Sequence, residues 1–271
     1  MSFIRNQILR PLYHVCRHLC HTRYLKSLYV NFRILPFRQA IRMPIMIIAP
    51  VKIRNLSGRC IIKNQIRYKM FCIGADVDNM PQSFLPAQLN IQGTLILNGF
   101  VSLNKGASLV VWPDATMTLG DDVMICSGVT IKAVNKVTVG NHVMISAGCF
   151  IMDSSIHCIY NTKTMETDSP DGEINIGNNV WLNMYTDVIK WGSVPDGCIT
   201  TRYSLINKFQ DPDDINCILA GQPAKVIKRG YSQVHNFTTE RFIRHNADNS
   251  GKLILNDTQI RSENLVKKVL P

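Results

Sequence analysis

The stretch LGDDVMICSGVTIKAVNKVTVGNHVMIS, residues 119–146, places an apolar residue at every sixth position. A glycine often follows the apolar residue, and a second small or branched side chain stands four positions after it. Neither an α-helix nor an ordinary strand has this period. The register continues after short breaks, and its apolar positions are Leu119, Ile125, Ile131, Val137, Val139, Ile145, Ile151, Ile176, Leu182, Val188 and Val194.

Each hexad reads as one short flat strand and a corner, so that three hexads close a triangular coil whose apolar positions point inward. Such coils stack at the interstrand spacing of about 4.8 Å. A β-sandwich with alternating strands is the alternative, because a period of 2 divides 6, but the glycine phase and the spacing of three hexads favour a solenoid. The sequence therefore predicts an all-β protein, a parallel β-helix, over residues 46–230.

Two flanking segments differ from the repeat. Residues 1–45 form a basic segment with apolar residues at helical spacing, among them Ile4, Ile8 and Leu12, and are predicted to be largely helical. Residues 231–271 form a C-terminal extension that contains a predicted helix through FTTERFIRHNAD, capped at Thr238 or Thr239. Packing or capping of the solenoid is the expected role of this extension.

The charge is concentrated at the N-terminal end. The chain of 271 residues is 46% apolar, which excludes a disordered or collagen-like protein, and carries 30 Lys and Arg against 19 Asp and Glu. The first acidic residue is Asp76, and fourteen basic residues precede it. Such charge suggests nucleic acid or an anionic membrane, but no nucleic-acid motif is present. We expect no nucleic-acid partner. The basic segment is expected either to contact the inner face of the cytoplasmic membrane peripherally or to pack as a helix on the end of the solenoid.

Several features favour a cytoplasmic location. No apolar run reaches the length of roughly 18 to 20 residues that a membrane-spanning helix needs. Arg10, His14 and Arg17 interrupt the place where a secretory signal would have its apolar region. The nine cysteines are odd in number and scattered, which predicts reduced thiols.

A long excursion interrupts the repeat after IMDSSIHCI. Residues 158–175, CIYNTKTMETDSPDGEIN, are polar and rich in turn-forming residues, and loops of this kind in a solenoid are usually functional. Asp153 and His157 stand at the base of this loop. A histidine oriented by a carboxylate is suited to act as a general base that removes a proton from a hydroxyl. The alternative is a corner histidine that only forms a hydrogen bond with a loop carbonyl.

Three segments resemble the hexapeptide-repeat acyltransferases, in particular those that act on sugars of bacterial capsules and lipopolysaccharides. They are MISAGCFIMDSSIHCI (144–159), INIGNNVWLNMYTDVIKWGSVPDG (174–197) and ILAGQPAKVIKRG (218–230). The resemblance implies a left-handed β-helix, a homotrimer with an active site between two subunits, and acetyl-CoA as the donor, without a metal. It implies that His157 is the catalytic base, and that Asp153 holds the imidazole tautomer or binds the sugar.

The same resemblance assigns further site residues. Lys225 and Lys228 would bind the phosphates of coenzyme A, with solvated surface cations as the alternative for Lys228, while Gly221 and Ala224 shape the turn before them. Lys190 and Ser204 would line the slot for the pantetheine chain. Trp181 would pack beneath the loop and, together with Ser127, would bind the sugar substrate. Where relatives generally have glycine or other small residues, this chain has Trp191, Arg202 and Tyr203, which could narrow, reshape or close the slot.

Competing functions lack support in the sequence. A zinc lyase on a similar fold needs three converging histidines, and the repeat region offers only His142 and His157. The cluster His14, Cys16, His18, Cys20 and His21 fits an amphipathic helix better than a zinc site. We therefore expect an O-acetyltransferase that moves an acetyl group to a hydroxyl or amino group of a sugar or lipid-linked glycan in surface polysaccharide biosynthesis. A catalytically impaired β-helix that binds a glycan or acts as a scaffold is the alternative.

Overall fold

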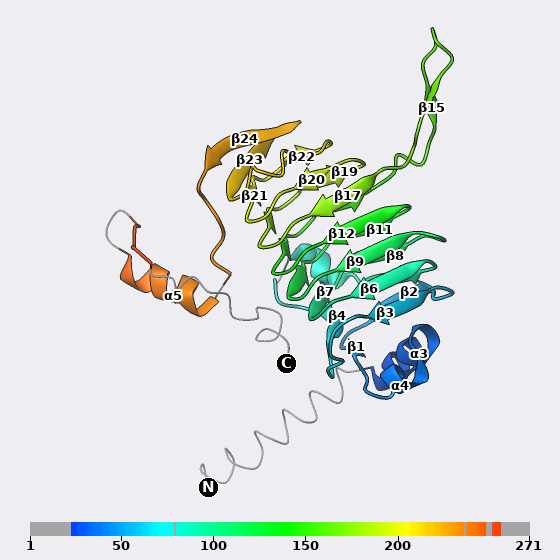
Figure 1. Cartoon of the computed structure of the whole chain (residues 1–271). Helices are drawn as coiled ribbons and strands as arrows, with labels where there is room; N and C mark the ends of the chain where they lie inside the picture. The colour runs from blue at the N-terminus through cyan, green and yellow to red at the C-terminus, as the bar shows by residue number, and fades with distance from the viewer. Residues whose placement is uncertain (1–22, 79, 236, 248–250, 256–271) are drawn as a thin grey trace.

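The structure, a computed structural model, describes residues 23–78, 80–235, 237–247 and 251–255. Its centre is a solenoid whose three sides are parallel β-sheets (Figure 1). Neighbouring strands pair in parallel along all three sheets up to β22, and each coil contributes its strands to the sheets in chain order. The predicted left-handed parallel β-helix is therefore confirmed, and the β-sandwich alternative is wrong.

The strands are distributed over the three sides of the solenoid as follows. Sheet A contains β1 (Ile45–Ile47), β4 (Phe71–Ala75), β7 (Val101–Asn104), β10 (Val123–Ile125), β13 (Met144–Ile145), β18 (Trp181–Leu182), β21 (Ile199–Thr200), β23 (Cys217–Gly221) and β24 (Ala224–Arg229). Sheet B contains β2 (Val51–Asn55), β5 (Ala87–Ile91), β8 (Ser108–Val111), β11 (Thr130–Ala133), β14 (Phe150–Met152), β19 (Asp187–Ile189) and β22 (Leu205–Ile206). Sheet C contains β3 (Arg59–Ile62), β6 (Thr94–Leu97), β9 (Thr116–Leu119), β12 (Lys136–Val139), β17 (Glu173–Ile176) and β20 (Ser193–Val194).

The core is built from columns of identical register. In sheet B, Leu109, Ile131, Ile151 and Val188 are direct partners in successive coils, and all four are fully buried. Inward and outward side chains alternate along each strand, so that β9 buries both Met117 and Leu119. The six-residue period of the sequence is therefore the length of one strand and its corner, after which an equivalent inward position recurs.

Corner side chains connect one coil to the next. The Asp121 backbone N–H donates to Asn141 Oδ1 (2.8 Å), and the Asn141 N–H donates to Asn178 Oδ1 (2.9 Å). The glycine that precedes each corner is required by close approach, because a Cβ on Gly120 would lie 2.2 Å from the carbonyl oxygen of Gly140. This ladder explains why Gly-Asp and Gly-Asn follow the apolar position in the repeat.

Helices close the N-terminal end of the solenoid. Helix α3 (Tyr24–Ile34) lies against β1 and is followed by α4 (Phe37–Ala40). Asn31 Oδ1 accepts the N–H of Ile45 (3.1 Å), and Ser27 Oγ accepts the N–H of Ile47 (2.9 Å). These side chains satisfy the edge of β1, which has no further strand beside it. The part of the predicted N-terminal helix before residue 23 lies outside the described residues.

The C-terminal end is closed by a reversal of the chain. Strand β24 pairs antiparallel with β23, and helix α5 (Phe237–Asn246) follows at the position predicted for a helix. A short 3-10 helix, η2 (Pro81–Phe84), lies in the connection from β4 to β5. No helix within the described ranges is long and apolar enough to cross a membrane.

Candidate active site

The long excursion from the repeat forms a β-hairpin that projects from the fifth coil, between β14 and β17 (Figure 1). Its strands are β15 (Ile159–Tyr160) and β16 (Thr167–Asp168), which pair antiparallel. Its base is fixed by hydrogen bonds: the Ser155 N–H donates to the Pro170 carbonyl and the Gly172 N–H to the Asp153 carbonyl, both at 2.8 Å. The base of the hairpin is therefore a continuation of the rigid solenoid.

His157 stands at this base with its side chain exposed. Its backbone is fixed by a tight turn, in which the His157 N–H donates to the Ser155 carbonyl (2.7 Å) and Ser155 Oγ donates to the His157 carbonyl (3.0 Å). The preceding residue, Ile156, has φ +63°. Among the described residues the imidazole has no hydrogen-bond partner, so its nitrogens are available to a ligand.

The Asp153 carboxylate does not bind the partners that the sequence predicts, His157 or a sugar. It is fully buried and accepts the backbone N–H groups of Val134 (2.7 Å) and Asn135 (2.9 Å) in the preceding coil. Burial raises the pKa of this carboxyl, although the backbone hydrogen bonds act in the opposite direction. No hydrogen bond joins it to His157 in the described part of the chain. Asp153 therefore holds the corner on which the hairpin stands, and does not orient the imidazole.

Lys190 and Trp191 support the hairpin from the following coil. Lys190 Nζ donates to the Ser169 carbonyl (2.8 Å), so its ammonium group contacts the hairpin and not an open slot. The ring of Trp191 lies against Gly172, where an added Cβ would be 2.9 Å from the ring atom Cδ2. Trp191 adopts φ +66° and also contacts Phe209.

Trp181 does not lie beneath the hairpin, and that prediction is wrong. It belongs to β18 in sheet A, where its indole Nε1 donates to Ser146 Oγ (2.8 Å). The hairpin leaves the solenoid at the corner between sheets B and C. The tryptophan beneath the hairpin is Trp191, from the next strand connection.

Two serines predicted to line binding surfaces are enclosed. Ser127 is fully buried, and its hydroxyl donates to Asp78 Oδ1 (2.7 Å) in the connection from β4 to β5. Ser204 is almost fully buried, and its hydroxyl donates to the Thr201 carbonyl (2.7 Å). Neither hydroxyl faces solvent in this chain, which contradicts the expected roles in sugar and pantetheine binding.

The predicted phosphate-binding lysines lie on the terminal hairpin. Gly221 takes φ +105° at the turn from β23 to β24, and Ala224 is buried beside it. Lys225 and Lys228 are exposed on β24, and the ammonium group of Lys228 lies 5.5 Å from the ring centre of Tyr231. These residues belong to sheet A, whereas His157 stands at the corner between sheets B and C. One chain therefore places the lysines and the imidazole on different sides of the solenoid.

An aromatic pair occupies another corner of the last coils. The rings of Tyr185 and Tyr203 stack with centroids 5.2 Å apart, and the guanidinium of Arg202 lies 5.0 and 4.7 Å from the two ring centres. Both tyrosines have positive φ, a conformation that favours glycine and asparagine. The structure brings Tyr185 together with Arg202 and Tyr203, two of the departures identified in the sequence.

Sequence reasoning missed a second imidazole–carboxylate pair. His142 Nδ1 donates to Asp122 Oδ2 (3.1 Å), and the hydrogen bond raises the pKa of His142. The ring of His235, from the segment after β24, lies 6.4 Å from that of His142. His235 is nearly fully buried, and burial lowers its pKa. The repeat region therefore contains a histidine paired with a carboxylate, at a site other than the base of the hairpin.

Thiol and metal chemistry find little support in the described residues. Cys149 is buried, its thiol donates to the Asn183 carbonyl (3.1 Å), and burial raises its pKa to about 12. The seven cysteines that the structure describes are free thiols. No group of three or more His, Cys, Asp or Glu side chains in these ranges is arranged to hold a metal ion. The cluster from His14 to His21 lies outside the described residues.

Sequence comparison finds relatives of this chain in two bacteria. No protein-family model matches the chain. The chain is 26% identical over 223 residues to the "Uncharacterized 24.8 kDa protein in cps region" of Klebsiella pneumoniae, covering 82% of this chain and 95% of the relative. It is 23% identical over 152 residues to the "Putative lipopolysaccharide biosynthesis O-acetyl transferase WbbJ" of Escherichia coli (strain K12), covering 53% of this chain and 76% of the relative.

Among solved structures, the polySia specific acetyltransferase NeuO matches with a TM-score of 0.44 and 19% identity, over 73% of this chain and 88% of NeuO. In fold and in sequence, the chain resembles the hexapeptide-repeat acyltransferases.

Proposed function

We propose that the protein is a coenzyme A-dependent acyltransferase that moves an acetyl group to a hydroxyl or amino group of a sugar in surface polysaccharide biosynthesis. The observation that carries the proposal is His157, an exposed imidazole without a partner among the described residues, on a backbone fixed at the base of a projecting hairpin. The names of the Escherichia coli relative and of NeuO, and the capsule-region origin of the Klebsiella relative, support the substrate class.

The reaction needs only one proton-transfer group. The His157 imidazole accepts the proton of the acceptor hydroxyl while the oxygen attacks the carbonyl carbon of the thioester. The bond between that carbon and sulfur then breaks, and the imidazolium returns its proton to the departing thiolate of coenzyme A. No acyl-enzyme forms in this mechanism, and the buried Cys149 thiol, whose pKa is raised to about 12, plays no part in it.

Substrate binding requires surfaces from more than one side of the solenoid. In this proposal Lys225 and Lys228, both exposed on β24, bind the phosphates of coenzyme A. Because they lie on a different side from His157 in the same chain, a complete site forms between two subunits of a homotrimer. Lys190 and Trp191 contribute by fixing the hairpin rather than by contacting the donor.

The test compares His157→Ala and His157→Gln with the wild-type full chain. Acetyl transfer from labelled acetyl-CoA is measured on a panel of surface polysaccharides and nucleotide sugars, and acetyl-CoA affinity is measured by calorimetry. General-base catalysis contributes about 10²- to 10⁴-fold, so both variants should lose at least about 100-fold in kcat. Their affinity for acetyl-CoA should be unchanged, because the imidazole contacts the acceptor.

The matched control is Lys163→Ala, an exposed residue at the tip of the same hairpin. It should retain wild-type kcat. Equal kcat in the wild type and the His157 variants would contradict the mechanism. A wild-type protein that binds no acetyl-CoA would favour the glycan-binding or scaffold function, to which the aromatic corner of Tyr185, Arg202 and Tyr203 would then belong.

A further inference from the structure

Helix α3 exposes large apolar side chains on the face opposite its buried one. Its buried face consists of Ser27, Val30, Asn31 and Ile34, and it packs on β1. Positions 25, 28, 29 and 32 lie on the opposite face of a helix with 3.6 residues per turn. A surface helix normally directs polar side chains away from the core. In α3 the polar Ser27 and Asn31 point inward, and large apolar side chains point outward.

The outward side chains join those of α4 in one surface. We call it the α3–α4 apolar face, and it consists of Leu25, Leu28, Tyr29, Phe32, Phe37 and Ile41, all exposed. Leu25 is 84% and Phe37 70% accessible, values far above those of an apolar residue that packs within its own chain. The rings of Phe32 and Phe37, 5.7 Å apart, connect the two helices. Continuous apolar surface of this kind marks an interaction site.

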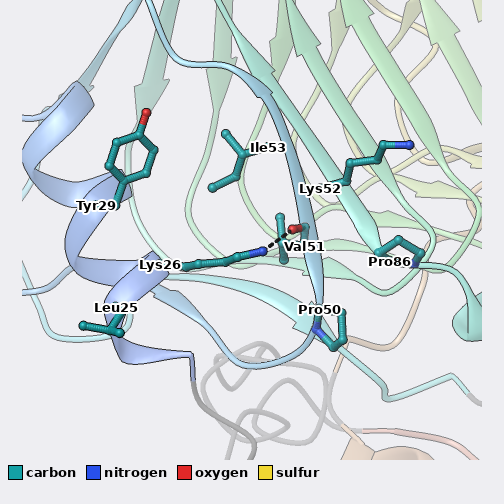
Figure 2. A pocket seen from close by; sticks show the side chains of 8 residues that line it. All are labelled: Leu25, Lys26, Tyr29, Pro50, Val51, Lys52, Ile53 and Pro86. Carbon is teal, nitrogen blue, oxygen red and sulfur yellow. Dashed lines mark hydrogen bonds between the residues drawn. The ribbon is translucent and has the colours of Figure 1, made fainter.

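A groove continues this face onto the first coil. It has a volume of about 650 Å³ and lies between α3 and β2, with Leu25 and Tyr29 on one wall and Val51 and Ile53 on the other (Figure 2). Lys26 Nζ donates to the Val51 carbonyl (3.1 Å) and so ties the helix to the strand. The groove therefore extends the apolar surface from the helix onto the first coil.

Basic side chains surround the face, and acidic ones are absent from this part of the chain. Residues 23–75 contain eleven Lys and Arg and no Asp or Glu. Lys26 and Arg33, seven residues apart, follow one border of the apolar face, and Arg38 and Arg42 accompany α4. None of these four forms an ion pair with another described residue. The face thus combines exposed aromatic and aliphatic groups with free positive charge.

We propose that the α3–α4 apolar face docks on an anionic phospholipid bilayer, with its apolar side chains between the headgroups and its basic border on the lipid phosphates. Charge complementarity favours this occupant over a second copy of the chain, which would bring two positively charged borders together. The apolar and aromatic centre favours lipid over nucleic acid, whose backbone binds basic and polar groups. The combination of an apolar helix face and flanking Lys and Arg is that of helices that lie in the membrane interface.

The experiment is cosedimentation of the full-length protein with vesicles of phosphatidylcholine alone or of phosphatidylcholine with one quarter phosphatidylglycerol. Binding should be at least about tenfold stronger to the anionic vesicles and should weaken as salt is raised. The double variant Leu25→Gln/Phe32→Gln should bind about tenfold or more weakly, because two apolar side chains no longer leave water. Arg38→Gln/Arg42→Gln should lose about tenfold on anionic vesicles only.

The matched control is Arg241→Gln/Phe242→Gln on α5, which removes one exposed aromatic residue and one exposed arginine elsewhere. It should bind vesicles like the wild type. Equal binding to both vesicle types, or wild-type binding by the α3–α4 variants, would overturn the proposal. A change in the mass of vesicle-free protein in the Leu25/Phe32 variant would assign the face to a second copy, and competition by DNA would assign it to nucleic acid.

This proposal is independent of the proposed acyl transfer. The α3–α4 variants alter side chains four coils away from the projecting hairpin, and their thermal unfolding and acetyl-CoA affinity should match those of the wild type. A variant that loses vesicle binding but still binds acetyl-CoA tests the membrane proposal alone. A His157→Gln variant that loses catalysis but still binds vesicles tests the proposed acyl transfer alone.

Discussion

The Asp153 carboxylate connects two coils at the point where the hairpin leaves the solenoid. It accepts two backbone N–H groups, of Val134 and Asn135, and has no contact with solvent. A buried N–H group that loses its acceptor costs about 1–3 kcal/mol. The position of His157 therefore depends on a carboxylate that never touches it.

Replacing Asp153 with Ala should lower the free energy of unfolding by about 1–3 kcal/mol for each N–H left unpaired. Urea unfolding of the full chain would measure the loss, and hydrogen exchange should show faster exchange at Val134 and Asn135. Asp168→Ala, in exposed strand β16, is the matched control and should unfold like the wild type. Unchanged stability in Asp153→Ala would contradict the structural role given to this residue.

The role of a residue could be predicted from the sequence only where the repeat, or its interruption, determines the position of that residue. The interruption after Ile151 identified His157 as a corner residue, and this is where it stands. The partners of Asp153 lie one coil back in the chain, and only the coordinates reveal them. Asp122 and His142, in contrast, occupy the same position in LGDDVM and VGNHVM, so alignment of the hexads would have predicted that they stack.

Among the secondary-structure elements, the segment from β24 to α5 is held to the solenoid by few polar contacts. His235 lies against the Asp122–His142 pair, and Gln233 Nε2 lies 3.7 Å from Met144 Sδ. Burial and the neighbouring His142 lower the pKa of His235 below its ordinary value of 6.5, against the opposing effects of Asp122 and a backbone hydrogen bond with Asn179. Docking of this segment is therefore coupled to protonation.

Docking through His235 should weaken in acid. The docked state binds fewer protons at His235 than the undocked one, so this contribution is fully present above pH 6.5 and is lost as the pH falls through the lowered pKa. Opening should increase by up to about tenfold per pH unit in acid. Hydrogen exchange of residues 231–235, corrected for intrinsic rates, would measure it between pH 7.5 and about 5.

The control for this experiment is His235→Leu, which keeps an apolar contact without a titrating group. Because leucine does not titrate, the hydrogen-exchange protection of residues 231–235 in this variant should not fall between pH 7.5 and about 5 on account of residue 235. The raised pKa of His142 acts with the opposite sign, since its contribution is fully present below pH 6.5 and is lost as the pH rises through the raised value. Equal pH dependence in wild type and His235→Leu would exclude His235 as the source.

At the scale of the whole molecule, the parallel solenoid distributes the candidate site over different sides. The sequence predicted the solenoid because each six-residue repeat corresponds to one side of a three-sided coil. It could not predict that the Ser127 and Ser204 hydroxyls are enclosed, because their partners, Asp78 and the Thr201 carbonyl, lie in irregular segments. The positions within the repeat can thus be predicted from the sequence, whereas the contacts of the irregular segments between strands cannot.

If the active site forms between subunits, acetyl transfer should require the assembled homotrimer. Light scattering of the purified protein should give a mass three times that of the 30.6 kDa chain. Dilution below the assembly midpoint should abolish acetyl transfer, because His157 and the lysines of β24 then no longer meet. Full specific activity in a monomeric sample would contradict a shared site.

The stacking of coils also sets a distance. The α3–α4 apolar face closes the first coil, and the hairpin leaves the fifth. Four steps of about 4.8 Å separate them, roughly 20 Å along the solenoid axis. With the first coil resting on a bilayer, the length of the solenoid sets the height of His157 above the membrane. If both proposals hold, a sugar attached directly to a lipid headgroup would lie too close to the bilayer for His157, and the expected acceptor is a sugar farther along a growing glycan.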